Sequence, residues 1–261
     1  MKRMRQGEAM EKTERQDFII GRNAVMELLK SGKEIEKIFV QNGDIKGSVL
    51  KILAMARENG VPIKEVSQTK LDMMCAGGNH QGVAASIPAA SYAELEDIFA
   101  LAQRKGEAPF LIIADEIEDP HNLGAIIRTA EAAGAHGIII PKRRSVGLTG
   151  TVYKTSAGAC AHLPVVRVSN ITATMQQLKK QGVWLYGADM DGQNWCEQDY
   201  SGPVGLVIGS EGHGIGKLVR ETCDFIVSLP MCGKVNSLNA SVACGIMMYE
   251  ITRQRHGIQA K

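Results

Sequence analysis

The spacing of apolar residues divides the chain into two regions of α/β character. In the first region, extended patterns alternate with helical ones after a short apolar stretch at 18–20. The predicted strands are 36–41, 62–66 and 82–87, and the predicted helices start near Asn23 and cover 48–59 and 69–74. This alternation predicts one small α/β domain, which we place at residues 17–88.

The second region contains six short apolar runs, most of them separated by helical patterns. The runs are 110–114, 137–140, 164–168, 183–187, 204–209 and 225–229. Near-continuous apolar strands that alternate with helices are typical of a parallel sheet covered on both faces. We therefore predict a C-terminal α/β domain with a parallel sheet at residues 108–261.

The remaining segments carry weaker patterns. Residues 1–16 are polar, charged and without period, which predicts a disordered arm. Residues 89–107 contain a predicted helix at 93–105, and we assign them as a linker between the two domains.

Composition narrows the class of protein. The chain has 261 residues, 44% of them hydrophobic, and 30 Lys and Arg against 28 Asp and Glu, a net charge of +2. This balance gives no basic bulk, so any nucleic-acid contact must come from local clusters. The six cysteines form no C-x-x-C pair, which favours reduced thiols in a cytoplasmic protein without a metal site. We find no signal peptide and no apolar run of ~18–20 residues, so we expect neither secretion nor a membrane partner.

Three clusters of candidate chemistry follow predicted strands, at the sheet edge where open α/β sheets collect ligands. The first runs from 115 to 134 and contains Asn122 and Arg128. We expect Arg128 in the second turn of a helix that begins near Pro120, where its guanidinium can meet a phosphate or carboxylate bidentately. A solvated Arg128 is the alternative, and we expect a structural role for His121.

The second cluster is the glycine-rich segment 205–216 around Glu211. Its pattern does not fit the G-x-x-x-x-G-K-[ST] phosphate loop, because Leu218 follows Lys217, and it contains no G-x-G-x-x-G dinucleotide motif after a strand. A nicotinamide or nucleotide enzyme is therefore disfavoured. What remains is a turn whose glycines let a ligand approach the backbone, with an ordinary glycine-rich turn as the alternative.

The third cluster lies in the segment 229–250, where a polar loop leads into a predicted helix that opens at Ser237. Four apolar residues recur at helical spacing: Leu238, Val242, Ile246 and Tyr249. The loop leaves backbone groups for a ligand, and Ser237 and Asn239 add donors and acceptors beside the positive end of the helix dipole. Ser and Asn are also common N-caps, so capping alone is the alternative.

Together the clusters resemble the three sequence motifs of the SpoU (TrmH) family of RNA ribose 2′-O-methyltransferases. The matching segments, in order, are Pro120-His-Asn-Leu-Gly-Ala-Ile-Ile-Arg128, Val207-Ile-Gly-Ser-Glu-Gly212, Leu229-Pro-Met231 and Asn236-Ser-Leu-Asn-Ala-Ser-Val-Ala243. The resemblance implies an enzyme of the SPOUT superfamily that uses S-adenosyl-L-methionine and has a deep trefoil knot in its C-terminal domain. It also implies a homodimer whose active site is completed near the subunit interface.

The resemblance further implies roles for individual residues. Arg128 matches the residue regarded as the base, but a guanidinium with a pKa above ~12 is a poor base at neutral pH. We therefore expect Arg128 to clamp the target phosphate or ribose oxygen, and to act as base only if the site lowers its pKa strongly. Asn122, Glu211, Ser237 and Asn239 would orient Arg128, the substrate and the cofactor. Cofactor contacts, largely through backbone groups, would come from Tyr186, Gly187, Ala188, Gly209, Leu229, Met231 and Leu238.

The first domain resembles the substrate-binding domain of the large-subunit rRNA guanosine 2′-O-methyltransferases through Gly21-Arg-Asn-Ala-Val25 and His80-Gln-Gly-Val83. This implies a guanosine of 23S rRNA as the substrate, with tRNA as the second candidate and no DNA partner. A non-catalytic RNA-binding factor in ribosome assembly is the alternative class of protein. The candidate RNA contacts are Arg22, Asn23, His80, Gln81, Lys142, Arg143 and Arg144. The alternatives are a satisfied turn residue at His80 and a solvated loop at 142–144.

Overall fold

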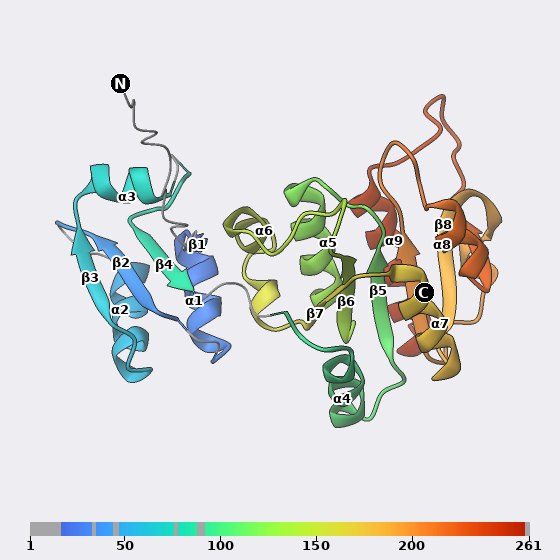
Figure 1. Ribbon diagram of the computed structural model, residues 1–261, viewed down its shortest axis with the longest axis horizontal. Coiled ribbons are helices and arrows are strands. Elements are labelled where there is room, and N and C mark those ends of the chain that lie inside the picture. The colour runs from blue at the N-terminus through green and yellow to red at the C-terminus, as the bar shows by residue number, and fades with distance from the viewer. Residues whose placement is uncertain (1–16, 33–34, 44–46, 76–77, 88–91, 259–261) are drawn as a thin grey trace, which may run out of the picture.

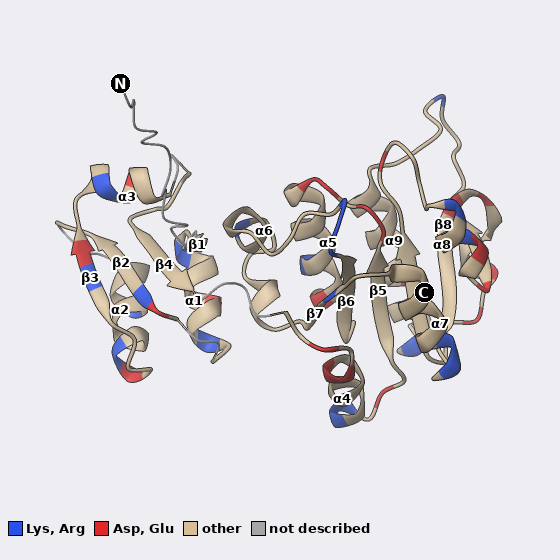
Figure 2. Cartoon of the chain, in the orientation of Figure 1, with Lys and Arg blue, Asp and Glu red and all other residues tan. Residues whose placement is uncertain are grey.

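The computed structural model describes residues 17–258 apart from 33–34, 44–46, 76–77 and 88–91. Figure 1 shows two β-sheets in separate lobes, with α6 (Gly150–Thr155) between them. The predicted arm at 1–16 and part of the predicted linker lie outside the described residues. Basic and acidic residues are interspersed over both lobes (Figure 2), in keeping with the small net charge. Among the described residues, no helix has the length and apolar character needed to cross a membrane.

The N-terminal lobe is a four-stranded sheet in the order β1-β4-β2-β3. Its strands are β1 (Asp17–Ile20), β2 (Lys37–Gln41), β3 (Ile63–Val66) and β4 (Val83–Ile87). Its helices are α1 (Arg22–Lys30), α2 (Ser48–Glu58) and α3 (Gln68–Met74). Strands β2 and β3 are parallel, and the other two pairs are antiparallel. All the predicted elements of this region are present, and β1 is a strand that the pattern did not predict.

Successive side chains of β2 point to opposite faces of this sheet, and each face has its own apolar core. Ile38 and Val40 belong to the core beneath α1 and α2, whereas Phe39 packs with Leu71 of α3 in a second cluster.

The C-terminal lobe is a six-stranded sheet in the order β10-β8-β9-β5-β6-β7, and every pair in it is parallel. The strands are β5 (Phe110–Ala114), β6 (Gly137–Pro141), β7 (Val165–Val168), β8 (Trp184–Asn194), β9 (Val204–Ile208) and β10 (Phe225–Ser228). The predicted parallel sheet is confirmed.

Helices cover both faces of this sheet. On one face lie α5 (Pro120–Ala132), α6 and α9 (Ala240–Arg255), and on the other lie α4 (Leu95–Lys105), α7 (Ile171–Lys180) and α8 (Lys217–Thr222). Ile112 and Ile138 point into the core on the first face, and Leu111 and Ile139 into the core on the second. Because both faces are buried, the central strands β5 and β9 are apolar along their whole length.

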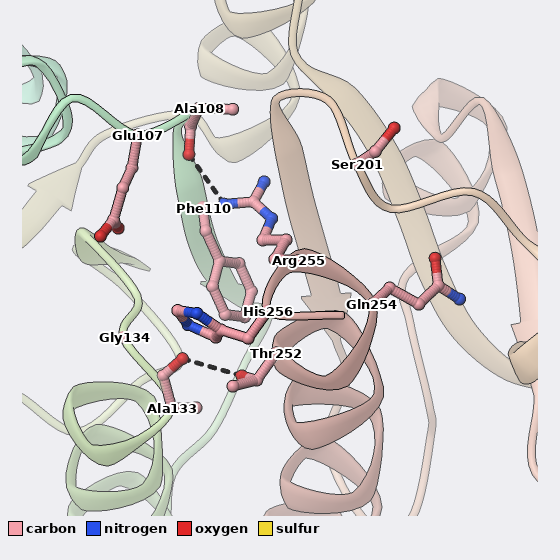
Figure 3. Close-up of a pocket in the computed structure, with 10 residues that line it drawn as sticks. All are labelled: Glu107, Ala108, Phe110, Ala133, Gly134, Ser201, Thr252, Gln254, Arg255 and His256. Carbon is pink, nitrogen blue, oxygen red and sulfur yellow. Dashed lines mark hydrogen bonds between the residues drawn. The ribbon is translucent and has the colours of Figure 1, made fainter. Parts of the chain in front are cut away.

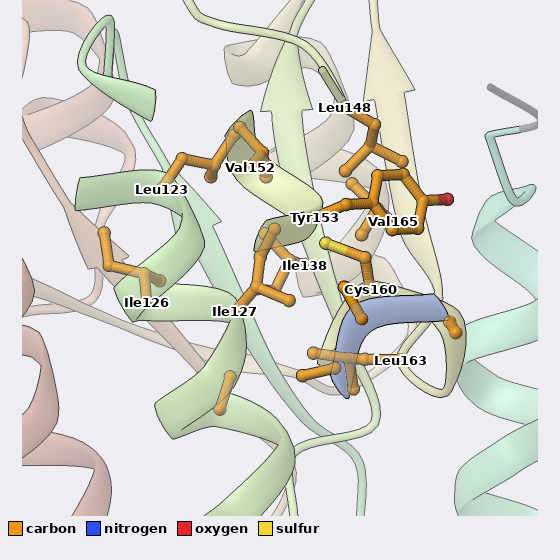
Figure 4. Close-up of a cluster of buried hydrophobic side chains, with 14 of the residues drawn as sticks. Leu123, Ile126, Ile127, Ile138, Leu148, Val152, Tyr153, Cys160, Leu163 and Val165 are labelled. Carbon is orange, nitrogen blue, oxygen red and sulfur yellow. The ribbon is translucent and has the colours of Figure 1, made fainter. Parts of the chain in front are cut away.

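The core beneath α5 and α6 fixes the position at which α5 begins. The apolar residues that form it include Leu123, Ile126, Ile127, Ile138, Val152 and Tyr153 (Figure 4). Gly124 lets the two helices approach closely, since a side chain at this position would overlap that of Thr155. Thr155 Oγ1 donates a hydrogen bond to Pro120 O at 3.1 Å. The first turn of α5 is therefore held by α6.

Strand β8 continues well beyond its predicted end at residue 187. Gly187 pairs with Ile226, but the next pair along is Gln193 with Val227, so residues 188–192 bulge out of the ladder. Arg220 holds this bulge through ion pairs to Asp189 and, at 2.8 Å, to Asp191. A polar continuation of this kind is not visible in an apolar pattern.

Helix α9 differs from its prediction in two ways. It begins at Ala240 and not at Ser237, because Asn239 is its N-cap. The four apolar residues used to predict it, Leu238, Val242, Ile246 and Tyr249, are between 40% and 53% exposed. The buried residues instead include Cys244, Met248 and Ile251. We call the four exposed residues, Leu238, Val242, Ile246 and Tyr249, the α9 stripe.

The two lobes are in contact at two places, between α1 and the segment after α6 and between β1 and the start of α6. Glu27 Oε2 lies 3.1 Å from His162 Nε2. Gly158 packs against Glu27, and a side chain at Gly150 would overlap the carbonyl of Phe18.

Candidate active site

A cavity of about 390 Å³ lies at the carboxyl edge of the parallel sheet. It is formed by the loop after β5, the start of α5 and the turn after β9. The lining residues are Glu116, Ile117, Glu118, Asp119, Asn122, Ser210, Glu211, Gly212 and His213. Two of the three predicted clusters therefore meet at this edge, the one at which sheets of this type bind ligands.

Side chains from all three clusters join in one hydrogen-bond network. Asn122 Nδ2 donates to Glu211 Oε1 at 2.8 Å. Asn239 Nδ2 donates to Asn122 Oδ1 at 2.9 Å and also to Glu211 Oε1. We call these three residues the amide–carboxylate network. It brings together positions that are 117 residues apart in the chain, as for Asn122 and Asn239.

The N-terminus of α9 fixes the orientation of the Asn239 amide. Asn239 Oδ1 accepts from Ser241 N at 3.0 Å and from Val242 N at 3.3 Å. With its oxygen committed to the helix, the amide must present its NH₂ group to Asn122 and Glu211. The capping role and the site role of Asn239 are therefore one arrangement and not alternatives.

Glu211 is carried by a closed turn between β9 and α8. Ser210 and Gly214 exchange two backbone hydrogen bonds of 3.1 and 2.9 Å. The backbone of Gly209 lies against that of Gly214, where a side chain would overlap. The fold of the turn thus explains Gly209 even without a ligand.

Asp115 is bonded to the same turn, and sequence reasoning gave it no role. Its Oδ2 accepts from Gly216 N at 2.9 Å. Burial raises the pKa of this carboxyl above its ordinary value, while the hydrogen bond from Gly216 opposes the shift. The available signal was its position, directly after an apolar strand at the ligand-binding edge.

Arg128 is not part of the network. It lies in the third turn of α5, not in the second as predicted, and it is exposed. It follows Asn122 by six residues, roughly 9 Å along the helix axis and on a different face. It makes no hydrogen bond or ion pair within the described part of the chain. One copy of the chain therefore leaves Arg128 apart from Asn122, Glu211 and Asn239.

Ser237 and His121 also lie outside the network. Ser237 is exposed in the loop before α9. The backbone N–H of His121 donates to Asp119 Oδ1 at 3.0 Å, which caps α5.

The predicted cofactor residues lie within β8, directly after β9 and on the loop after β10. Tyr186 is buried, donates its hydroxyl to Asp199 O at 2.7 Å and stacks on Phe225. Burial raises the pKa of this hydroxyl. Gly187 packs against Cys223 and Ile226. The Tyr186 side chain is thus committed to the core, and only the backbone at this point of β8 remains for a ligand.

The loop 229–238 contains the other predicted cofactor residues apart from Ala188 and Gly209. Met231 and Leu238 are 38% and 40% exposed. Residues 229–238 form no backbone–backbone hydrogen bond among the described residues. Such a loop has both exposed apolar side chains and free backbone groups to offer a ligand.

The predicted RNA contacts of the N-terminal lobe fall into two groups. His80 is buried, with Nδ1 accepting from Gly82 N and Nε2 lying 2.9 Å from Asp72 Oδ1, which favours the structural alternative. Arg22 Nε donates to Gln81 O at 2.9 Å, and Asn23 beside it is exposed.

The basic loop after β6 lies near the cavity. Lys142 and Arg143 are exposed. Arg144 Nη1 forms an ion pair of 3.1 Å with Glu116 Oε1, a residue that lines the cavity. Arg144 and Glu116 both have positive φ angles, of 54° and 55°. Non-glycine residues rarely adopt this left-handed backbone conformation, and here two of them are in contact. The loops after β5 and β6 are therefore conformationally constrained beside the cavity.

A second cavity, of about 430 Å³, lies at the opposite end of the lobe, between the C-terminal ends of α5 and α9 (Figure 3). Arg255 donates to Ala108 O at 2.7 Å, Pro109 O at 3.0 Å and Tyr200 O at 3.2 Å. Because these carbonyls occupy its guanidinium, Arg255 anchors α9 and does not offer an anion site. Among the described residues, no group of three or more His, Cys, Asp or Glu could hold a metal ion.

Two protein-family models match the chain. Residues 109–249 match the SpoU rRNA Methylase family, and residues 18–93 match the RNA 2′-O ribose methyltransferase substrate binding family. Both matches agree with the division into two lobes.

Similar proteins cover almost the whole chain. A protein of Bacillus subtilis, YacO, assigned to the TrmH family of tRNA/rRNA methyltransferases, is 49% identical over 94% of this chain and 99% of its own length. A Staphylococcus saprophyticus protein with the same assignment is 46% identical over 93% of this chain and 98% of its own.

Solved structures have the same fold. The rRNA methyltransferase of Sinorhizobium meliloti, solved with bound AdoMet, has a TM-score of 0.78 and 26% identity, over 94% of this chain and 89% of that chain. The SpoU methyltransferase AviRb of Streptomyces viridochromogenes has a TM-score of 0.80 at 24% identity, over 97% and 96% of the two chains.

Proposed function

Because the chain belongs to the SpoU rRNA methylase family, we propose that this RNA methyltransferase methylates the ribose 2′-hydroxyl of a guanosine in 23S rRNA. The observation that carries the proposal is the amide–carboxylate network, which joins one polar residue from each of the three motifs. The second candidate substrate is tRNA, since the relatives are assigned to tRNA/rRNA methyltransferases.

We propose S-adenosyl-L-methionine as the cofactor, held by residues 186–188 of β8, by the end of β9 and by the loop 229–238. The residues present fit such a group. The exposed Met231 and Leu238 suit its adenine ring, and the free backbone groups of the loop suit its polar atoms. When bound, the cofactor supplies a methyl group on a sulfonium, whose departure leaves a neutral thioether.

The network would orient the substrate. Asn122 and Asn239 both donate to Glu211, so the carboxylate is held as an acceptor that faces the cavity. An oriented carboxylate can hold the attacking hydroxyl in line, and alignment of this kind supplies much of the rate enhancement in a transfer reaction. Ser237, which is exposed in the loop before α9, would also help to orient the substrate.

Arg128 would clamp a phosphate or ribose oxygen of the RNA. A guanidinium binds phosphate through two parallel N–H groups, and it is a poor base at neutral pH. An exposed Arg128 that has no partner among the described residues is available for this role.

We propose a homodimer in which the site is completed near the interface. The α9 stripe lies beside α5, and Gly245 of α9 packs against Thr129, next to Arg128. Three exposed apolar residues on one face of α9, Val242, Ile246 and Tyr249, together with Leu238 just before the helix, indicate an association surface. Pairing two copies there would bring Arg128 of each chain to a shared region.

The N-terminal lobe would bind the RNA substrate at a distance from the reacting ribose. We place this domain at 17–88, the linker at 89–107, whose helix α4 packs on the C-terminal sheet, and the catalytic domain at 108–261. The trefoil knot implied by the family stays a prediction. Arg22, Asn23 and Gln81 would contact RNA directly, while His80 would hold their turn. Lys142 and Arg143 would add phosphate contacts beside the cavity.

The test is to incubate the protein with methyl-labelled cofactor and unmodified large-subunit rRNA or tRNA, and to map any label by resistance to alkaline cleavage. A 2′-O-methyl group blocks the hydroxyl that attacks the adjacent phosphate, so the labelled position resists cleavage. We expect one labelled guanosine in the rRNA. Label on tRNA alone would show that the substrate is tRNA and not rRNA. Absence of label on rRNA, on tRNA and on a ribosomal precursor would contradict the proposed function.

A further inference from the structure

Asp115 is bonded to both ends of the turn that carries Glu211. It follows β5 and is only 6% exposed. Its backbone N–H donates to Ile208 O, at the end of β9, at 2.8 Å. Its carboxylate accepts from Gly216 N at 2.9 Å. Since Ile208 leads into the turn and Gly216 leads out of it, one residue ties the two ends together.

Glu211 depends on this turn for its position. Its side chain is exposed, so packing does not hold it. The turn is closed by the paired backbone bonds of Ser210 and Gly214, and Gly209 lies against Gly214. A displacement at Gly216 is therefore passed along a stiff backbone to Glu211.

We propose that Asp115 is a positioning residue for the methyl transfer: by holding both ends of the turn 209–216, it places Glu211 where Asn122 and Asn239 meet it. This proposal rests on the proposed function. Asp115 is not among the residues that line the cavity, so it acts through Glu211 and not on the substrate.

An ionised carboxylate suits this role, because hydrogen bonds to charged acceptors are roughly twice as strong as those between neutral groups. Removing the carboxylate would also leave the Gly216 N–H without its partner, which disfavours the present position of the turn. Asp115→Asn keeps an oxygen acceptor of the same shape, whereas Asp115→Ala removes it.

The first measurement is hydrogen exchange of the segment 209–216 in the full-length protein. Asp224→Ala is the matched control, because Asp224 Oδ2 accepts from Leu185 N at 2.9 Å, away from the turn. We expect the fastest exchange of the Gly216 amide in Asp115→Ala, a smaller increase in Asp115→Asn, whose neutral oxygen accepts more weakly, and unchanged exchange in Asp224→Ala. Unchanged exchange of the Gly216 amide in Asp115→Ala would show that the Asp115 side chain does not hold the turn 209–216.

The second measurement is a double-mutant cycle on the single-turnover rate of RNA methylation. We expect Asp115→Ala to lower the rate roughly 100-fold, as misplacement of a site group does, and Asp115→Asn to restore most of it. In a Glu211→Gln background, Asp115→Ala should change the rate by less than about twofold, because the residue through which it acts is already altered.

Two outcomes separate the possible failures. Losses that multiply in the double variant would show that Asp115 acts independently of Glu211, and would overturn the proposal. Absence of methylation by the unmutated protein on every RNA would overturn the proposed function and the catalytic part of this inference, while the exchange data would still decide whether Asp115 holds the turn.

Discussion

Asn122 donates its side-chain amide to Glu211 at 2.8 Å, although 89 residues separate the two in the chain. Asn122 is 8% exposed and lies in the first turn of α5, whereas Glu211 is exposed on the turn after β9. The contact therefore joins a buried, rigid group to one that packing does not hold. Such a pairing orients a carboxylate toward a cavity while leaving it open to a ligand.

Arg128→Ala should lower the rate of methyl transfer by about 100-fold or more, because it removes the charged group that we propose as the clamp on the RNA at the reacting centre. Arg128→Lys should recover only part of the loss, since an ammonium cannot bind an oxyanion bidentately. The rates are measured in single turnover, with RNA and cofactor affinities measured alongside. A near-normal rate in Arg128→Ala, with normal binding, would remove Arg128 from the mechanism.

If the protein is the dimer that we propose, Ile246→Glu should convert it into a monomer, because it places a charge in the centre of the α9 stripe, where burial of an unpaired carboxylate is costly. Light scattering after size-exclusion chromatography gives the mass directly. Leu50→Glu is the control, since Leu50 is 56% exposed on α2, in the other lobe. The interface assignment fails if Ile246→Glu remains a dimer, or if the unmutated protein is already a monomer.

Replacing Lys142 and Arg143 together by Gln should weaken RNA binding and reduce its dependence on salt. Each RNA phosphate that is no longer neutralised should lower the slope of log affinity against log salt by roughly 0.7 to 1. Arg144 is left unchanged because it pairs with Glu116. The double variant Lys105→Gln, Lys180→Gln removes the same charge elsewhere. Equal slopes in the two double variants would show that the loop does not bind RNA.

The stability of the protein should fall as the pH drops below about 6.5, the ordinary pKa of histidine, because of His136. Burial lowers the pKa of His136 in the folded state, so the unfolded chain binds the proton more readily. Its Nδ1 also accepts from Phe110 N at 2.9 Å, a bond that protonation would break. The free energy of unfolding, measured with denaturant between pH 8 and 5, should depend less on pH in His136→Asn than in the unmutated protein. The same pH dependence of the unfolding free energy in the unmutated protein and in His136→Asn would contradict this role of His136.

Much of the fold could be predicted because it follows from local apolar pattern. Strands buried on both faces are apolar throughout, and β5 and β9 were visible for that reason. The bulge of β8 was not, because Asp189 and Asp191 are held by Arg220, a partner distant in sequence. Periodicity identified α9 as a helix but could not tell which face is buried, since the α9 stripe and the core side are both apolar.

The site was predicted in part for the same reason. Glu211 follows a strand, Asn239 caps a helix and Asn122 lies in the first turn of a helix, so their place at the sheet edge could be inferred. Their mutual contacts depend on the three-dimensional arrangement of the strand ends. Arg128 was placed one turn too early, and Asp115 was missed because its partner Gly216 is 101 residues away.

The most direct test of the account is the single-turnover methylation rate of Asn239→Asp. This variant keeps an oxygen that caps α9, but it loses both donors to the network and sets a second carboxylate beside Glu211. We predict a rate roughly 100-fold lower, as for loss of a positioned donor, in a protein that is still folded and still binds the cofactor. A rate equal to that of the unmutated protein would show that the amide–carboxylate network is not the catalytic centre.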